Sequence, residues 1–238
     1  MGKIRLDKYL ADMGQGTRTE VKKAIKKGKI SVNQEIIKNP EYKVDTQTDV
    51  VVADGKKIVY EDLVYYMLNK PQGVVSATED KREKTVLDLI RDKKRKDLFP
   101  VGRLDKDTEG LLLITNDGEL AHQLLAPKKH VDKKYFVRLK TPLLEADRKH
   151  LEQGVDIGED KLTMPSRVFF LNEEKDEVEI IICEGKFHQV KRMFQAVGNE
   201  VVFLKRLSMG SLVLDEKLQI GEYRLLTSEE IERLKKNA

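Results

Sequence analysis

One carboxylate in a short polar turn, that of Asp105, could do chemistry in this chain. Residues 101–118 have the sequence V-G-R-L-D-K-D-T-E-G-L-L-L-I-T-N-D-G, in which Asp105 and Asp107 precede the apolar run 111–114. Short apolar runs bounded by turn residues are typical of buried strands. A carboxylate that a loop presents at the edge of a sheet can serve as a nucleophile or a base. A surface turn capped by either aspartate fits the same spacing, so the pattern leaves both interpretations open.

The elements that must position this turn are mostly strands. Apolar runs predict strands at residues 63–68, 111–114, 135–139, 155–157, 166–170, 177–183 and 201–204. Helical spacing or capping predicts helices at residues 85–90, 120–125, 143–153 and 229–236. In the strand at 135–139, residues Tyr135, Val137 and Leu139 share one face, because successive side chains of a strand alternate.

The strongest helical pattern begins at residues 184–186. The apolar stripe of this helix comprises Phe187, Val190, Met193, Phe194 and Val197. His188, Lys191 and Arg192 lie off that stripe. They form either an ordinary solvated helix face or part of a site.

Residues 1–60 form a distinct segment by charge and by pattern. They hold 13 Lys and Arg against 8 Asp and Glu, whereas the remaining residues hold 32 against 33. Two helices are expected, the first around residues 4–13 and the second ending at Lys27 with Thr17 or Thr19 as its cap, followed by short strands at 30–33 and 50–52. A basic segment beside a neutral one points to an anionic partner, although lysine-rich helices are often only well solvated.

Composition excludes several classes of protein. The chain has 238 residues, 39% of them hydrophobic, and a single cysteine, Cys183, which excludes an intrachain disulfide and a thiolate metal site. No apolar run approaches the roughly 18 residues of a membrane span, and the N-terminus lacks the pattern of a signal peptide. We therefore expect a soluble, cytoplasmic protein with no membrane partner. Nothing such as a heptad repeat demands a dimer, so a monomer is expected.

The turn at 102–118 resembles a known catalytic signature. G-R-L-D-x-x-T-x-G-L-L-L-x-T-N-D-G is similar to the signature of the pseudouridine synthases, in the branch typified by RsuA. The resemblance implies that Asp105 is the catalytic residue, acting either as a nucleophile at C1′ of the target uridine or as the base that removes the C2′ proton. It also implies that Arg103 holds the displaced backbone or fills the space that the flipped base leaves.

Three further stretches carry the same resemblance. N-K-P-x-G-x-x-S at 69–76 is a recurring opening of these synthases, and Lys134-Tyr135 matches a motif whose tyrosine stacks on uracil. E-G-K-F-H-Q-V-K-R-M-F at 184–194 resembles a third motif, whose basic residue after H-Q-V pairs with the catalytic aspartate. That residue is Lys191, where many members carry arginine, and Arg192 is the alternative. His188 is expected to position other groups by hydrogen bonding.

The N-terminal segment resembles the S4 RNA-binding module, through R-L-D-K-Y-L followed by T-R-T-E-V-K-K-A-I-K-K-G-K-I-S-V-N. The resemblance implies phosphate contacts by the basic residues Arg5, Lys8, Arg18, Lys22 and Lys26. It predicts an S4-like domain over residues 1–60 and a synthase domain over residues 61–238.

Together these resemblances imply an α+β protein whose catalytic domain is a mixed, mainly antiparallel sheet with flanking helices and a central cleft. The expected reaction is the isomerisation of one uridine of 16S ribosomal RNA to pseudouridine, either in free RNA or in an assembling small-subunit particle. It would need no cofactor and no metal. A 23S rRNA synthase of the same family is one alternative, and a non-catalytic RNA-binding factor of ribosome assembly is another.

Overall fold

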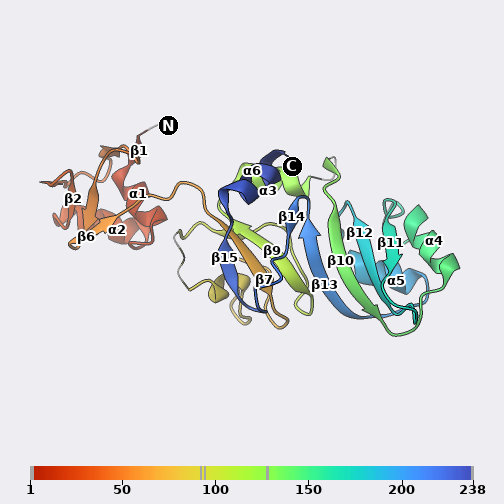
Figure 1. Ribbon diagram of the computed structural model, residues 1–238. Coiled ribbons are helices and arrows are strands. Elements are labelled where there is room, and N and C mark those ends of the chain that lie inside the picture. The colour runs from red at the N-terminus through yellow and green to blue at the C-terminus, as the bar shows by residue number, and fades with distance from the viewer. Residues whose placement is uncertain (1–2, 92, 94, 127–128, 237–238) are drawn as a thin grey trace. The chain divides into compact units, whose positions relative to one another are not determined.

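The chain folds into two compact units in a computed structural model that describes residues 3–91, 93, 95–126 and 129–236. The first unit comprises Met1–Val64 together with Arg91–Leu98, and the second comprises Tyr65–Ile90 together with Phe99–Ala238 (Figure 1). No helix in the described part of the chain is both long enough and apolar enough to cross a membrane.

The first unit packs two helices on small antiparallel sheets. Its elements are β1 (Ile4–Arg5), α1 (Leu6–Asp12), α2 (Arg18–Lys26), β2 (Ile30–Val32), β3 (Glu35–Ile36), β4 (Lys43–Val44), β5 (Val51–Ala53) and β6 (Lys56–Ile58). Strand β1 pairs with β4, and the other four form a sheet in the order β3-β2-β5-β6. Thr17 caps α2 as expected: its hydroxyl accepts from the Glu20 N–H at 3.3 Å, and the Glu20 carboxylate accepts from the Thr17 N–H at 2.7 Å.

Residues 95–98 belong to the first unit although they lie far along the sequence. The Arg95 side chain is only 3% exposed, and its guanidinium binds both carboxylate oxygens of Asp97 at 2.7 Å. It also donates to the carbonyl of Glu61 at 2.6 Å and lies 3.2 Å from a carboxylate oxygen of Asp12. A buried guanidinium needs such partners, so these contacts fix the segment to the unit.

The second unit is built on one long mixed sheet, as predicted for an α+β fold. Its strands are β7 (Tyr65–Lys70), β8 (Phe99–Pro100), β9 (Glu109–Thr115), β10 (Lys133–Leu139), β11 (Arg167–Phe170), β12 (Glu177–Ile182), β13 (Val201–Met209), β14 (Leu212–Val213) and β15 (Tyr223–Leu225). The main order is β11-β12-β10-β13-β9-β7-β15, with β14 paired to β13 and β8 to β9.

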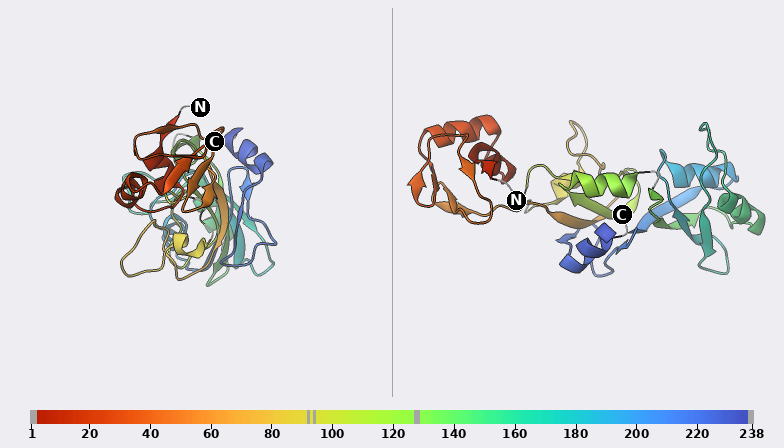
Figure 2. Two further views of the ribbon diagram at one scale, coloured as in Figure 1. Left: turned by 90° about the vertical axis from the view of Figure 1, so that its left-hand side faces the viewer. Right: turned by 90° about the horizontal axis from the view of Figure 1, so that it is seen from above.

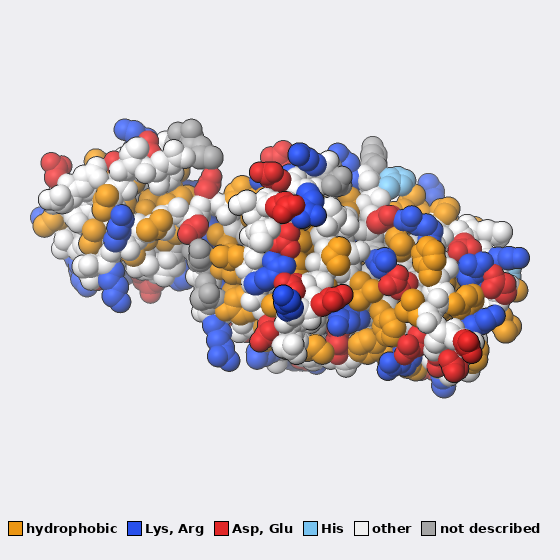
Figure 3. All heavy atoms as spheres, in the orientation of Figure 1, with side chains coloured by type: hydrophobic (Ala, Val, Ile, Leu, Met, Phe, Trp, Pro, Cys, Tyr) orange, Lys and Arg blue, Asp and Glu red, His pale blue; other side chains and the backbone are white. Residues whose placement is uncertain are grey.

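The helices of this unit divide between the two halves of the sheet. They are α3 (Gly118–Leu125), α4 (Glu145–Gln153), α5 (Gln189–Ala196) and α6 (Ser228–Lys236), with a 3-10 helix at Val86–Leu89. Helices α3 and α6 lie by the β7–β9 half, and α4 and α5 lie by the β10–β12 half (Figures 1 and 2). In Figure 3 charges of both signs alternate over the visible face of the unit, and hydrophobic side chains gather over β10 and β13.

The apolar run at 111–114 forms the centre of this sheet, within β9. Its four residues, like Met67 and Leu68 of β7, have no exposed surface. Strand β9 pairs antiparallel with β7 but parallel with β13, through Lys205 opposite Glu109 and Arg206 opposite Gly110. A parallel pair brings the starts of both strands to the same edge. The turn before β9 and the helix before β13 therefore meet there.

Gly110 lets β9 and β13 approach each other. Its φ is +101°, and a Cβ atom there would overlap the carbonyl oxygen of Arg206 and lie 2.8 Å from the Arg206 nitrogen.

We expect Gly110→Ala to lower the free energy of unfolding by about 3 kcal/mol, because the backbone of β9 or of β13 must move to relieve the overlap. Urea unfolding would measure this. The matched control is Gly118→Ala at the start of α3, where a Cβ meets nothing within 4 Å. The control should be neutral or stabilising by up to about 1 kcal/mol.

Three sequence predictions about elements were wrong. Helix α5 begins at Gln189, after the residues expected to start it, and Phe187 lies outside the buried stripe with 69% of its surface exposed. The amide of Gln189 explains the late start, because its oxygen accepts from the Lys186 N–H at 2.9 Å and closes a separate turn. Residues 155–157 form no strand.

Candidate active site

The backbone of the turn that carries Asp105 is clamped by buried side chains. The Lys70 ammonium, at the end of β7, donates to the carbonyls of Asp105 at 2.9 Å and Thr108 at 2.8 Å. The Ser76 hydroxyl donates to the Leu104 carbonyl at 2.8 Å and accepts from the Leu104 N–H at 3.0 Å. The N-K-P-x-G-x-x-S stretch therefore fixes the turn, a function that its sequence did not reveal.

Lys70 is fully buried, with no carboxylate in direct contact among the described residues. Burial lowers the pKa of Lys70 to about 8, against the opposing attraction of Asp107 and Asp105. The ammonium is held chiefly by carbonyl dipoles, including that of Pro71 at 3.0 Å.

The Asp105 carboxylate meets two groups from the α5 region. Its Oδ2 lies 3.1 Å from the Lys191 Nζ, and its Oδ1 lies 3.4 Å from the His188 Nε2. Lys191 also binds the Oδ1 of Asp107 at 2.5 Å. Burial lowers the pKa of Lys191, but the hydrogen bonds to Asp107 and Asp105 outweigh it and the pKa is raised. Lys191 therefore remains a cation at neutral pH and places its positive charge beside the Asp105 carboxylate.

Asp107 is part of this cluster although the sequence predictions gave it no function there. Burial raises its pKa, but the hydrogen bond and charge of Lys191 outweigh this and the pKa is lowered. In the sequence, only its position two residues after Asp105 in the same turn could have indicated that Asp107 belongs to the cluster.

A pocket opens in front of Asp105. Its lining comes from the turn, from β10, β12 and β13, from the segment before α5 and from the first two residues of α5. The lining residues are Arg103, Leu104, Asp105, Thr108, Tyr135, Ile182, Gly185, Lys186, His188, Gln189, Val190 and Leu204. Tyr135 is 8% exposed, so most of its ring is packed. Arg103 is exposed, and its side chain makes no polar contact within the described residues. A flat polar ring could enter beside Tyr135 and face the carboxylate.

Two predicted substrate-binding residues point elsewhere. Lys134 lies on the face of β10 opposite Tyr135 and pairs with Glu179 at 2.9 Å. Arg192 binds Glu159 at 2.8 Å and the carbonyls of Phe187 and Ile157. Both side chains are occupied by contacts outside the pocket, and Lys191 is the one of the two adjacent cations that reaches Asp105.

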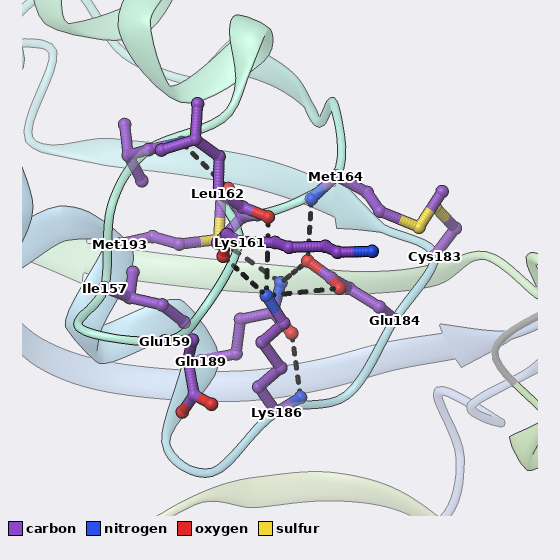
Figure 4. A network of polar contacts seen from close by, with 12 residues as sticks. Ile157, Glu159, Lys161, Leu162, Met164, Cys183, Glu184, Lys186, Gln189 and Met193 are labelled. Atoms are coloured by element: carbon purple, nitrogen blue, oxygen red, sulfur yellow. Dashed lines mark hydrogen bonds and ion pairs between the residues drawn. The ribbon is translucent and has the colours of Figure 1, made fainter.

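A polar network supports the segment before α5 (Figure 4). The Gln189 amide donates to Glu184 at 2.7 Å, and the same Glu184 oxygen accepts from the Met164 N–H at 2.8 Å. Lys186 donates to the carbonyl of Lys161 at 3.2 Å. The network ties the residues that line the pocket to the loop after α4. Gln189 and Glu184 stand in the third motif, which was the only sequence signal for them.

In the first unit the expected RNA contacts differ in how they are paired. Arg5 binds Asp7 and Glu41, each at 2.9 Å, and Lys8 binds Asp12 at 2.6 Å. The remaining three stand on α2. Lys22 lies 3.8 Å from Asp7, whereas the side chains of Arg18 and Lys26 make no polar contact with described residues.

The described residues contain no group of three or more His, Cys, Asp or Glu placed to hold a metal ion.

The chain matches two family models. Residues 64–196 match RNA pseudouridylate synthase, and residues 4–51 match the S4 domain. A protein of Bacillus subtilis (strain 168) that is named as an uncharacterized RNA pseudouridine synthase is 49% identical over 97% of this chain and 98% of its own. Ribosomal small subunit pseudouridine synthase A of Vibrio vulnificus (strain CMCP6) is 42% identical over 96% of this chain and 98% of its own. A crystal structure of a pseudouridylate synthase superposes with a TM-score of 0.69 at 39% identity, covering 97% of this chain and 99% of the other.

Proposed function

The chain belongs to the RNA pseudouridylate synthase family, whose reaction isomerises uridine in RNA, and we propose that its substrate is one uridine of 16S ribosomal RNA and its catalytic group is Asp105. The position of the Asp105 carboxylate supports its catalytic role. It lies 3.1 Å from the Lys191 ammonium and lines the same pocket as Tyr135.

The reaction breaks the bond between C1′ and N1, and it forms a bond between C1′ and C5. The C5 proton leaves and N1 gains a proton, so no electrons are exchanged with an outside reagent. Two routes use Asp105. Its carboxylate can attack C1′ and expel the uracil anion, or it can remove the C2′ proton to give a glycal. Both routes need an ionised carboxylate, and the Lys191 ammonium lies 3.1 Å from it.

Tyr135 and Lys191 have separate functions in this proposal. The Tyr135 ring stacks on uracil and keeps the freed base over the sugar while the base turns. Its phenol can pass a proton late in the reaction. Lys191 pairs with Asp105 and takes no proton itself. Arg103, exposed at the pocket and free of contacts within the described residues, holds the displaced backbone or fills the space that the flipped base leaves.

The choice of 16S rRNA rests on near full-length similarity to proteins named ribosomal small subunit pseudouridine synthase A, at 39–42% identity in Vibrio, Haemophilus and Salmonella species. The S4 match adds an RNA-binding module at the N-terminus.

Mapping pseudouridine in rRNA from cells with and without the gene tests the proposal. The rRNA is treated with a carbodiimide, which marks pseudouridine so that reverse transcription stops there. One such stop in 16S rRNA should be missing in the deletion strain. Wild type should restore the stop, and Asp105→Asn should not. A stop lost from 23S rRNA would overturn the choice of substrate and leave the chemistry. An unchanged pattern in both RNAs would favour an RNA-binding assembly factor.

The exposed cations of α2 give a separate prediction about affinity. Charge reversal of Lys22 and Lys26 to Glu should weaken binding to a 16S transcript by about tenfold or more at low salt and reduce the slope of log Kd against log salt, because phosphate contacts release counterions. Filter binding across a salt series would measure both. The same reversal at Lys57, which is exposed on β6, is the matched control. If the double reversal leaves the slope unchanged, α2 does not bind RNA phosphates.

A further inference from the structure

Phe187 is an exposed aromatic residue beside the pocket. At 69% it is more exposed than any other large hydrophobic side chain that the structure describes. One face of its ring stacks on the His188 imidazole, with centroids 3.7 Å apart and planes within 19°. Because the stack covers one face and most of the side chain remains in solvent, the outer face is available to a ligand.

The stacked pair is held firmly. His188 has left-handed backbone angles, φ 47° and ψ 35°, which a non-glycine residue adopts only when its surroundings enforce them. Those surroundings are hydrogen bonds. Arg192 donates to the Phe187 carbonyl at 3.0 Å, and the Gln189 amide accepts from the Lys186 N–H at 2.9 Å. The exposed ring is therefore presented in a fixed orientation, which lowers the entropy lost when a ligand stacks on it.

Its position relates it to the reacting nucleotide. His188 lines the pocket with its Nε2 3.4 Å from Asp105, whereas Phe187 is outside the pocket lining. Phe187 is thus stacked on the imidazole that contacts Asp105 but does not itself line the pocket. A base stacked on its outer face would be a neighbour of the flipped uridine, and not the uridine itself.

We propose that the Phe187–His188 stack is a platform for the unpaired base next to the target uridine. The chemistry fits RNA, because every base has a π-face that an aromatic side chain can stack on. The inference rests on the proposed function, because its ligand is the RNA substrate. The platform adds a second contact by which the enzyme holds the RNA after the target base has left the stack.

The test uses chains that bind RNA but cannot react. Kd values for 16S and 23S transcripts would be compared between Asp105→Asn and Asp105→Asn/Phe187→Ala by filter binding. We expect the double variant to bind about 5- to 150-fold more weakly to the transcript that holds the target. The salt slope should not change, because a stacked base releases no counterions. Phe187→Trp in the same background should bind within about threefold of Asp105→Asn.

The matched control is Phe169→Ala, which removes another exposed phenylalanine of the same unit, 48% exposed on β11 and outside the pocket lining. It should leave Kd unchanged.

In chains with Asp105 intact, Phe187→Ala should raise KM and leave kcat unchanged, since stacking outside the pocket contributes equally to the ground state and the transition state. Equal Kd values for Asp105→Asn and Asp105→Asn/Phe187→Ala would overturn the platform. The exposed Phe187 ring would then be assigned to contact with a protein partner. A wild type that forms no pseudouridine would instead refute the proposed function, and the binding comparison would still decide on the platform.

Discussion

Asp105→Asn should lower the rate of pseudouridine formation by at least about a thousandfold and leave RNA binding within about twofold of wild type. The amide keeps the shape of the carboxylate but can neither attack C1′ nor remove the C2′ proton. Single-turnover release of tritium from 5-³H-uridine RNA would measure the rate, and filter binding would measure the affinity. Because the Asp105 side chain is 24% exposed, the variant should melt within a few degrees of wild type.

Asp107→Asn is the matched control, since this carboxylate lies in the same turn and binds the same ammonium at 2.5 Å. Lys191 would then pair with Asp105 alone, so we expect less than about a tenfold loss of rate. Equal losses in the two variants would mean that the turn acts through its total charge. An active Asp105→Asn enzyme would remove Asp105 from the mechanism altogether.

The sequence predicted the turn that carries Asp105 and the strand after it, because both are local. Residues 111–114 are continuously apolar between turn residues, and they are buried in β9 as expected. The alternation of Tyr135, Val137 and Leu139 in β10 was also confirmed, since all three are buried. The capping box at Thr17 follows from residues three positions apart. In each case neighbouring residues carry the whole signal.

What the sequence missed depends on contacts between distant segments. Phe187 has the spacing of a buried helix stripe, and only the turn closed by Gln189 moves it outside the helix. Lys191 and Arg192 are adjacent cations, and the sequence left Arg192 as the alternative to Lys191. The loop after α4 decides between them, because Glu159 engages Arg192. Arg95 belongs to the first unit through contacts with Asp12 and Glu61, more than 30 positions earlier in the chain.

Lys70→Met should reduce activity by at least about a hundredfold and destabilise the protein by about 2 kcal/mol at pH 7. Methionine fits the buried space but leaves the carbonyls of Asp105, Thr108 and Pro71 without their donor. A turn released by even 1 Å would misplace the carboxylate, which is enough for a loss of that size. The activity assay would be single-turnover tritium release, and the stability would come from urea unfolding.

The stability effect should depend on pH in a defined direction. Burial lowers the pKa of Lys70 from its ordinary value of 10.5 to about 8. Between these values the unfolded chain holds a proton that the folded protein has released, so the contribution of Lys70 to the free energy of unfolding rises with pH in this window. The difference between wild type and Lys70→Met should therefore grow by up to about 3 kcal/mol from pH 8 to pH 10.5.

Lys106→Met provides the comparison for stability, because Lys106 lies in the same turn but is exposed, and among the described residues its ammonium pairs with Glu83 alone, at 2.8 Å. An exposed ion pair contributes little, so this variant should unfold within about 0.5 kcal/mol of wild type over the same pH range. A Lys70→Met difference that stays flat above pH 8 would show that Lys70 keeps its ordinary pKa in the folded protein. Its hold on the turn would then come from an ammonium that water still reaches, and the turn would open more readily than the buried contacts imply.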